Sequence, residues 1–252
     1  MKIPVDLITT IRASSRLAAL TGAGVSQESG LRTFRDKVDD ISSESERPLW
    51  TQYRPEDLAT PEAFERNPNL VWDFYAMRRL KAGEVQPNAG HIALAEIGRR
   101  VAYFTLITQN VDGLHQRAGS ESVIELHGNI TRVRCTHGCG VFTEWEDKPE
   151  TVPLCPQCGS KLRPDVVWFG EMLPQSELES AMEAARTSQV FFSIGTSALV
   201  QPAASLPLVA KQSGALVVEI NPEETPLTAR VDYFLQGKSG EVLPELVKQV
   251  WN

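Results

Sequence analysis

The sequence lacks an excess of basic residues, long hydrophobic runs and dispersed cysteines. Lysine and arginine number 25 against 32 aspartates and glutamates, and the net charge of −7 argues against a nucleic acid as the main partner. No apolar run approaches the ~18 residues of a membrane-spanning helix, and residues 1–15 resemble neither a signal peptide nor a transit sequence. We therefore expect a cytoplasmic protein that has no membrane partner.

The four cysteines lie close together, as Cys135-x3-Cys139 followed by Cys155-x2-Cys158. Neighbouring glycines free the backbone to turn, so two such pairs can place four thiolates around one tetrahedral Zn²⁺. A closed shell of four thiolates predicts a structural zinc rather than a catalytic one. His137, within the first pair, is an alternative ligand, and four unrelated buried thiols are the other alternative.

A glycine turn follows the first predicted strand, but a complete dinucleotide fingerprint is missing. Gly22-Ala23-Gly24 comes directly after the apolar residues 17–20, whereas Gln27 occupies the place of the third glycine in G-x-G-x-x-G. No strand ending in an acid follows at the usual distance. The turn is therefore either a pyrophosphate-binding loop or an ordinary connection between a strand and a helix.

Strand and helix patterns alternate along most of the chain. Apolar runs predict strands at residues 102–108, 123–126, 190–194, 215–220 and 231–235. Helical spacing appears at 4–14, 61–81, 91–100, 202–213 and between Val242 and Val250, and the polar stretch 37–60 predicts a surface loop. This alternation is typical of a parallel sheet covered by helices on both faces.

Polar residues follow two of these strands at their carboxyl ends. Gln109, Asn110 and Asp112 come after residues 102–108, and His127 comes after residues 123–126. Open α/β sheets bind their ligands at this edge, and an imidazole there is a natural general base for a hydroxyl group. The alternatives are a structural histidine in a turn and polar residues that cap turns or helices.

These motifs, in their order, resemble the sirtuins, a family of NAD-dependent protein lysine deacylases. The segments that carry the resemblance are Gly22-Ala23-Gly24-Val25-Ser26, Thr33-Phe34-Arg35, Thr108 to His115, Leu126-His127-Gly128-Asn129, the cysteine quartet, Val167-Trp168-Phe169-Gly170-Glu171, Gly195-Thr196-Ser197 and Asn221-Pro222-Glu223. The resemblance implies an α/β fold with a Rossmann-like, doubly wound parallel sheet and a small inserted domain. Residues 1–36, 91–129 and 164–252 would form the NAD-binding domain. A helical and cofactor-loop segment (37–90) and a zinc ribbon (130–163) would form the small domain.

The resemblance also implies an NAD site in which the cofactor lies inverted relative to redox dehydrogenases. Its parts would be Gly22, Ala23, Gly24, Val25, Ser26, Gly195, Thr196 and Ser197 at the phosphates, Phe34 and Arg35 at the nicotinamide end, Gln109, Asn110, Val111 and Asp112 around nicotinamide and ribose, Asn221, Pro222 and Glu223 at the adenosine ribose, and Ser239 at the adenine. His127 takes the catalytic position, together with Asn110 and Asp112. The products would be free lysine, nicotinamide and O-acyl-ADP-ribose.

Four further residues would bind the acyl-lysine protein or peptide. Val167 and Phe169 would pair with the substrate backbone by strand addition. Tyr75 and Arg78, three residues apart on a helix, resemble the Tyr-x-x-Arg pair of class III sirtuins, whose preferred acyl groups end in a carboxylate. The alternative is that Arg78 is only a solvated charge on the helix surface. We expect removal of succinyl and malonyl groups, and of acetyl groups as well.

Two other functions stay open from the sequence. Mono-ADP-ribosyl transfer or NAD hydrolysis could use the same site, and would be recognised by the fate of label from NAD. A zinc-ribbon module that binds nucleic acid or protein on a vestigial fold is the alternative outside enzymes, although the acidic net charge argues against nucleic acid.

Overall fold

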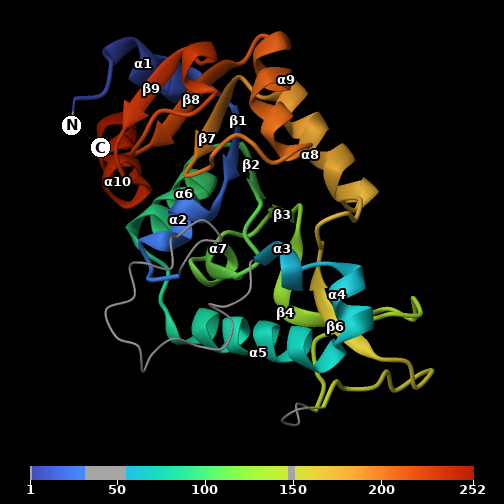
Figure 1. The fold of residues 1–252 in the computed structure, drawn as a ribbon. Coiled ribbons are helices and arrows are strands. Elements are labelled where there is room, and N and C mark those ends of the chain that lie inside the picture. Colours follow the sequence, from blue (N-terminus) through green and yellow to red (C-terminus); the bar gives the residue numbers. More distant parts are fainter. Residues whose placement is uncertain (1, 32–54, 147–150) are drawn as a thin grey trace.

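A six-stranded parallel sheet organises the larger part of the chain in this computed structural model, which describes residues 2–31, 55–146 and 151–252 (Figure 1). Its strand order is β3-β2-β1-β7-β8-β9, and every neighbouring pair is parallel. The strands are β1 (Arg16–Thr21), β2 (Tyr103–Thr108), β3 (Val123–Glu125), β7 (Val190–Ile194), β8 (Leu216–Asn221) and β9 (Tyr233–Gln236). The strand order reverses between β1 and β7, so the doubly wound Rossmann-like prediction is confirmed.

Helices cover both faces of this sheet. Leu17 and Ala19 of β1 pack with α1 (Val5–Ala13), α6 (Ala89–Arg100) and α10 (Ser239–Trp251). Ala18 and Leu20 point to the other face, where α8 (Gln175–Thr187) and α9 (Leu206–Gln212) lie. Because successive side chains of a strand alternate between faces, a strand covered on both sides is continuously apolar, as β1 is.

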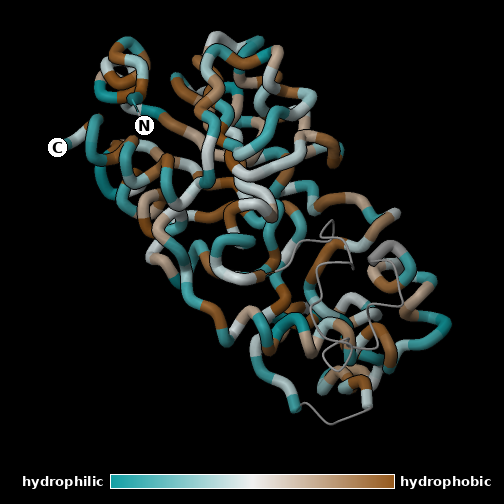
Figure 2. The backbone as a smooth tube through the Cα atoms, turned by 60° about the vertical axis from the view of Figure 1, so that its left-hand side comes forward, coloured by the Kyte–Doolittle hydropathy of each residue, from teal (hydrophilic) through white to brown (hydrophobic). Residues whose placement is uncertain are grey.

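A smaller unit has its own sheet and core at the lower end of Figure 1. It contains the antiparallel strands β4 (Gly128–Cys135), β5 (Val141–Phe142) and β6 (Leu162–Val166) and the helices α3 (Pro55–Leu58), α4 (Pro61–Arg66) and α5 (Pro68–Glu84). Figure 2 shows brown, hydrophobic stretches in both units. Residues from 58–82 and 130–168 share one apolar cluster. The exact domain boundaries stay a prediction.

Residues 61–81 were predicted as one helix, but the structure has two. The chain forms α4 and α5 with a break at Asn67, whose side chain accepts a hydrogen bond from the Leu70 amide. Pro68 follows, and a proline is accepted at the first position of a helix but interrupts a helix interior. The sequence pattern also missed α8, and the predicted helix over 202–213 starts with a 3₁₀ turn, η4 (Ala203–Ser205).

Short elements complete the connections: α2 (Ala23–Gln27), α7 (Leu114–Arg117) and the 3₁₀ turn η5 (Thr228–Arg230). Most of the predicted surface loop at 37–60 lies outside the described residues, and its described end contains α3. Across the described ranges, no helix has both the length and the hydrophobicity that crossing a membrane requires.

The two units are joined where two chain segments cross. Gly128 has φ +79°, and a Cβ placed on it would lie 2.1 Å from the carbonyl oxygen of Asp165. The next contact is a hydrogen bond of 2.9 Å from the Val167 amide to the His127 carbonyl. Only glycine fits this crossing, which brings the predicted general base beside the predicted substrate segment.

Candidate active site

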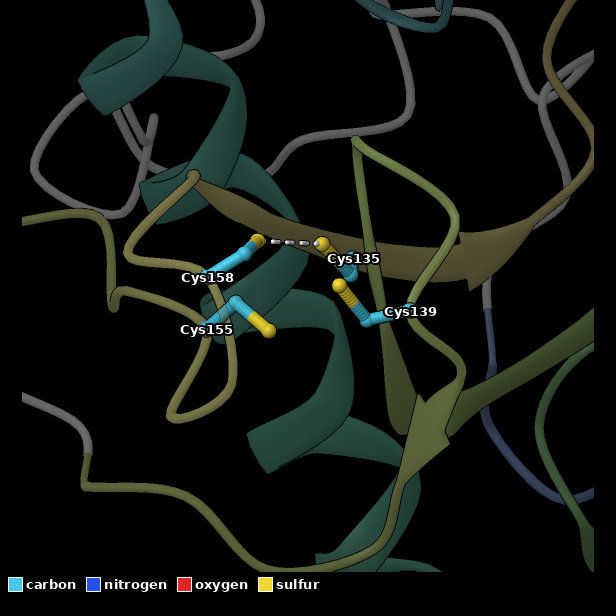
Figure 3. Close-up of side chains that lie close together, drawn as sticks. All are labelled: Cys135, Cys139, Cys155 and Cys158. Carbon is cyan, nitrogen blue, oxygen red and sulfur yellow. Dashed lines mark hydrogen bonds between the residues drawn. The ribbon is translucent and has the colours of Figure 1, made fainter.

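The four cysteines converge from two loops of the small unit (Figure 3). Their sulfur atoms all lie within 4.8 Å of one another, and Cys135 and Cys158 are 3.5 Å apart. Four sulfurs at ~2.3 Å from a tetrahedral Zn²⁺ lie within this range of separations, so the donor set fits a structural zinc. His137, the alternative ligand, is exposed and lies outside this group.

The glycine turn after β1 is shaped by its neighbour in the sheet. A Cβ on Gly22 or Gly24 would lie 2.8 Å from the Gly195 carbonyl oxygen, so both glycines let the two loops approach. The amides of Gly22 and Gly24 donate to carbonyls of Ile194 and Gly195, at 3.0 and 2.8 Å. These two N–H groups are therefore committed within the protein, whereas Ala23 between them is exposed.

Three predicted site residues form one buried polar cluster. Ser26 Oγ donates to Asp112 Oδ2 at 2.7 Å, and Asn110 Nδ2 donates to Ser26 Oγ and to the Gly22 carbonyl, both at 3.0 Å. Asp112 Oδ1 accepts from the Leu114 amide. Burial raises the pKa of Asp112, although its hydrogen bonds and nearby Arg78 oppose the rise. The sheet thus joins residues 26, 110 and 112 at one edge.

His127 lies half-buried at the same edge and is oriented by the backbone. Its Nδ1 is 2.9 Å from the Gln109 carbonyl oxygen, and Gln109 Nε2 donates to Thr196 Oγ1 at 3.0 Å. A carbonyl oxygen only accepts, so Nδ1 carries the hydrogen and Nε2 keeps its lone pair. Burial lowers the pKa of His127, while the bond to Gln109 opposes that shift. The neutral imidazole can therefore accept a proton at Nε2.

The predicted adenosine residues lie at the ends of β8 and α10. Asn221 is half-buried, and its Nδ2 donates to the Glu223 carbonyl at 3.1 Å, which holds the exposed turn. Ser239 is buried, and its hydroxyl donates to Glu28 Oε1 at 2.7 Å. The hydroxyl proton of Ser239 is therefore already used in a hydrogen bond that links α10 to the segment after α2.

The predicted acyl residues lie in the interior of the small unit. Tyr75 is 3% exposed, and burial raises its pKa to about 12, with Arg78 opposing the rise. Arg78 is half-buried, and its guanidinium carbon lies 5.7 Å from the centre of the Phe74 ring. Burial lowers the pKa of Arg78, and Tyr75 and Asp112 oppose that shift. Arg78 and Asp112 each favour the charged form of the other. Phe34 and Arg35 lie outside the described residues.

The predicted substrate segment uses its own amides internally. The N–H groups of Val167 and Phe169 donate to the carbonyls of His127 and Ala59, each at 2.9 Å, and the Trp168 amide donates to Glu171 Oε2 at 2.8 Å. An added strand therefore has to be recognised through the carbonyl groups of Val167 and Phe169.

The structure also brings together polar residues to which the sequence analysis assigned no role. His91 and His115 are fully buried with ring centres 4.8 Å apart, and His115 Nε2 is 2.9 Å from Thr21 Oγ1. Arg163 binds Glu171 across a tight turn. No local pattern marks either pair, because the partners are brought together by the fold rather than by helical spacing.

The protein has two parts, a parallel α/β sheet and a four-cysteine unit. Polar residues lie at the carboxyl edge of the sheet, which is where α/β proteins bind nucleotides. Comparison with known families matches residues 22–202 to the Sir2 family. The chain belongs to the Sir2 family.

Similar proteins and structures cover nearly the whole chain. NAD-dependent protein deacylase 1 of Archaeoglobus fulgidus is 53% identical over 97% of this chain and 96% of its own. The NAD-dependent protein deacylase of Aquifex aeolicus is 50% identical over 91% of this chain and 93% of its own. A crystal structure of a Sir2 homolog–NAD complex has a TM-score of 0.90 at 52% identity, covering 99% of this chain and 94% of that one. A Sir2–p53 peptide–NAD+ structure has a TM-score of 0.83 at 31% identity, covering 99% and 98%.

Proposed function

We propose that the protein is an NAD-dependent protein lysine deacylase that prefers succinyl- and malonyl-type acyl groups and also removes acetyl groups, releasing nicotinamide and O-acyl-ADP-ribose. Membership of the Sir2 family supports the reaction, because the relatives above are named NAD-dependent protein deacylases. The observation that carries the acyl preference is the pair Tyr75 and Arg78, which lies in the interior of the small unit and within electrostatic reach of Asp112.

The residues at the sheet edge fit NAD. Ser26, Asn110 and Asp112 form a buried polar cluster where α/β folds hold nucleotides, and such a cluster suits a polar ligand better than an apolar one. We assign the phosphates to exposed Ala23 with Thr196 and Ser197, and the adenosine ribose to the turn at Asn221 and Glu223. When bound, NAD supplies the ribose carbon that the acyl oxygen attacks and nicotinamide as the leaving group.

The chain's own residues have separate tasks in this reaction. Asn110 and Asp112 orient the ribose, and His127 Nε2 accepts a proton from a ribose hydroxyl. Because burial lowers the pKa of His127, the base stays neutral to lower pH than a free imidazole. The carbonyls of Val167 and Phe169 accept hydrogen bonds from the acylated peptide, which is our form of the strand-addition proposal.

The proposed acyl preference depends on the charge of Arg78 beside Tyr75. A guanidinium and a phenol together can hold a carboxylate, the first by charge and the second by hydrogen bonding. An acetyl group carries no charge, so it gains nothing from Arg78. An acid acyl group adds a charge-assisted hydrogen bond to the guanidinium, which an acetyl group cannot form.

The test is mass spectrometry of one peptide carrying succinyl-lysine or acetyl-lysine, incubated with and without NAD. The variant Arg78→Met is expected to lower desuccinylation about 100-fold and to spare deacetylation, because only the acid acyl group loses a charge partner. Lys81→Met, which removes an exposed cation from the same helix, is the matched control and should change neither rate.

The outcomes separate the proposals. Equal loss of both activities in Arg78→Met would mean that the guanidinium stabilises the charge of Asp112 and does not bind the acyl group. Removal of acetyl alone by the unmodified protein would retain the deacylase and exclude the acid preference. Label from NAD that stays on protein would indicate ADP-ribosyl transfer.

A further inference from the structure

Trp168 is the residue of the substrate segment that turns inward. Its neighbours Val167 and Phe169 are half-buried and exposed, whereas Trp168 is 3% exposed. Its ring centre lies 5.3 Å from that of Phe64 and 6.4 Å from that of Tyr75, the phenol of the proposed acyl pocket. The indole therefore links the segment that holds the peptide to the pocket that holds the acyl group.

The indole N–H of Trp168 is a buried donor without a well-formed hydrogen bond. Within the described part of the chain, Nε1 is shielded from solvent and no acceptor lies in hydrogen-bond geometry. An indole nitrogen can only donate, and a buried donor without an acceptor destabilises the protein. Such exceptions are rare in folded proteins and require an explanation, of which a ligand acceptor is one.

The indole ring is held rigidly in this place. The guanidinium carbon of Arg163 lies 3.3 Å from the ring centre, and Arg163 Nη2 donates to Glu171 Oε2 and to the Val166 carbonyl, both at 2.8 Å. Glu171 Oε2 also accepts from the Trp168 amide. One ion pair thus fixes both the ring and the backbone of the same residue, so its N–H is oriented before any ligand binds.

Trp168 and Arg78 both influence the phenol of Tyr75. The ring centres of Trp168 and Tyr75 lie 6.4 Å apart, and Arg78 follows Tyr75 by one turn of α5. Burial raises the pKa of Tyr75, and the charge of Arg78 and a hydrogen-bonding interaction with the Trp168 side chain oppose that rise. The indole N–H therefore faces the phenol without forming a well-aligned hydrogen bond with it.

We propose that Trp168 is a specificity-determining residue, whose indole N–H donates a third hydrogen bond to the terminal carboxylate of the acyl group, beside Tyr75 and Arg78. This inference rests on the proposed acid-acyl function. A carboxylate accepts at about four lone-pair sites, so three donors are compatible with one carboxylate. The methyl group of an acetyl substrate has no acceptor to offer.

The variant Trp168→Phe tests this, because it removes the N–H and keeps an aromatic ring beneath Arg163. We expect the ratio of kcat/KM for a succinyl-lysine peptide to that for the acetyl-lysine peptide to fall about tenfold, the effect of one charge-assisted hydrogen bond. The change should appear in KM more than in kcat. Calorimetric binding of the succinyl peptide without NAD should weaken by a similar factor.

Phe64→Leu is the control for packing, since it alters the ring against Trp168 but removes no donor. It should leave the succinyl-to-acetyl ratio within about twofold of the unmodified enzyme. An unchanged ratio in Trp168→Phe, whether both activities fall together or neither changes, would overturn the inference. If the unmodified enzyme handles acetyl peptides but binds no succinyl peptide, the acid-acyl function itself fails and this inference fails with it.

Discussion

The parallel sheet and the small cysteine-containing unit are stabilised by different kinds of interaction. In the large unit β1 and β7 are buried along almost their whole length, and the apolar sides of helices cover both faces. In the small unit β5 has two residues, and the core includes two cysteines and the ring of Trp168 stacked on a charged Arg163. Small units bury too little surface to depend on apolar packing alone.

The two units therefore differ in how their stability is related to the proposed site. Apolar packing is tolerant, so the large unit can hold a polar site at its edge while its core remains dry. Besides its apolar core, the small unit contains a few directional interactions, and these lie beside the proposed acyl residues. If the proposed acyl preference holds, Arg163 and Glu171 support both the stability of this unit and its selectivity.

Removing one ligand from the cysteine cluster should cause the largest loss of stability, and this loss should be confined to the small unit. Structural zinc contributes about 10–16 kcal/mol of apparent binding free energy to small domains. Cys155→Ser should abolish zinc binding and unfold the small unit, while the large sheet persists. Zinc content and tryptophan fluorescence would report this, because Trp72, Trp145 and Trp168 belong to the small-unit cluster. His137→Ser, at the exposed histidine, is the control, and full zinc content in Cys155→Ser would contradict the prediction.

Acid should act on the large unit instead, through His91 and His115. Burial lowers their pKa values to about 4 and about 3, so both rings stay neutral in the folded state. Unfolded, each ring titrates near 6.5, so the stability is complete above that pH and is lost as the pH falls towards 4. At pH 5 the loss is about 2 kcal/mol for each ring.

The measurement is urea unfolding from pH 8 to pH 5, followed by far-UV circular dichroism. His137→Gln, at an exposed ring, should retain the same slope. A free energy of unfolding that does not change between pH 7 and pH 5 would show that the two buried rings do not control acid stability.

The crossing between the units should respond to a single methyl group. Gly128→Ala places a Cβ 2.1 Å from a backbone carbonyl oxygen at a positive φ, so both a clash and strain oppose it, and we expect a loss of about 3 kcal/mol. Gly214 has φ +94° with no atom near the new Cβ, and Gly214→Ala should cost about 1 kcal/mol. Thermal denaturation of both variants separates the cost of the clash from the cost of the positive φ. Equal losses of stability would show that backbone movement relieves the clash.

Much of the fold was predictable because it rests on local patterns. The continuous apolar runs of β1, β2, β7 and β8 mark strands that are covered on both faces, and alternation with helices predicts parallel pairing. The helix break at Asn67 was not predicted, although Asn67-Pro68 is a local signal for a helix start that the apolar spacing obscured.

The candidate site was predictable only in part. Residues 109–112 and His127 follow strands, so the sheet brings them to one edge. The partners of Ser239 and Trp168 were not predictable, because Glu28 is 211 residues from Ser239 and Arg163 approaches Trp168 through a turn. The sequence left open whether the glycines after β1 approach a ligand or form an ordinary turn, and the structure adds that they allow the Gly195 loop to approach.

The alternation of strands and helices, the cysteine quartet and the polar residues at the strand ends can be recognised in the sequence, because each depends on spacing along one segment. The folded chain was needed to show which amides of the substrate segment are already bonded, which ring faces Tyr75 and which glycine the crossing between the units requires. Those properties depend on atoms of distant segments meeting within hydrogen-bond or van der Waals distance, and no local pattern encodes that approach.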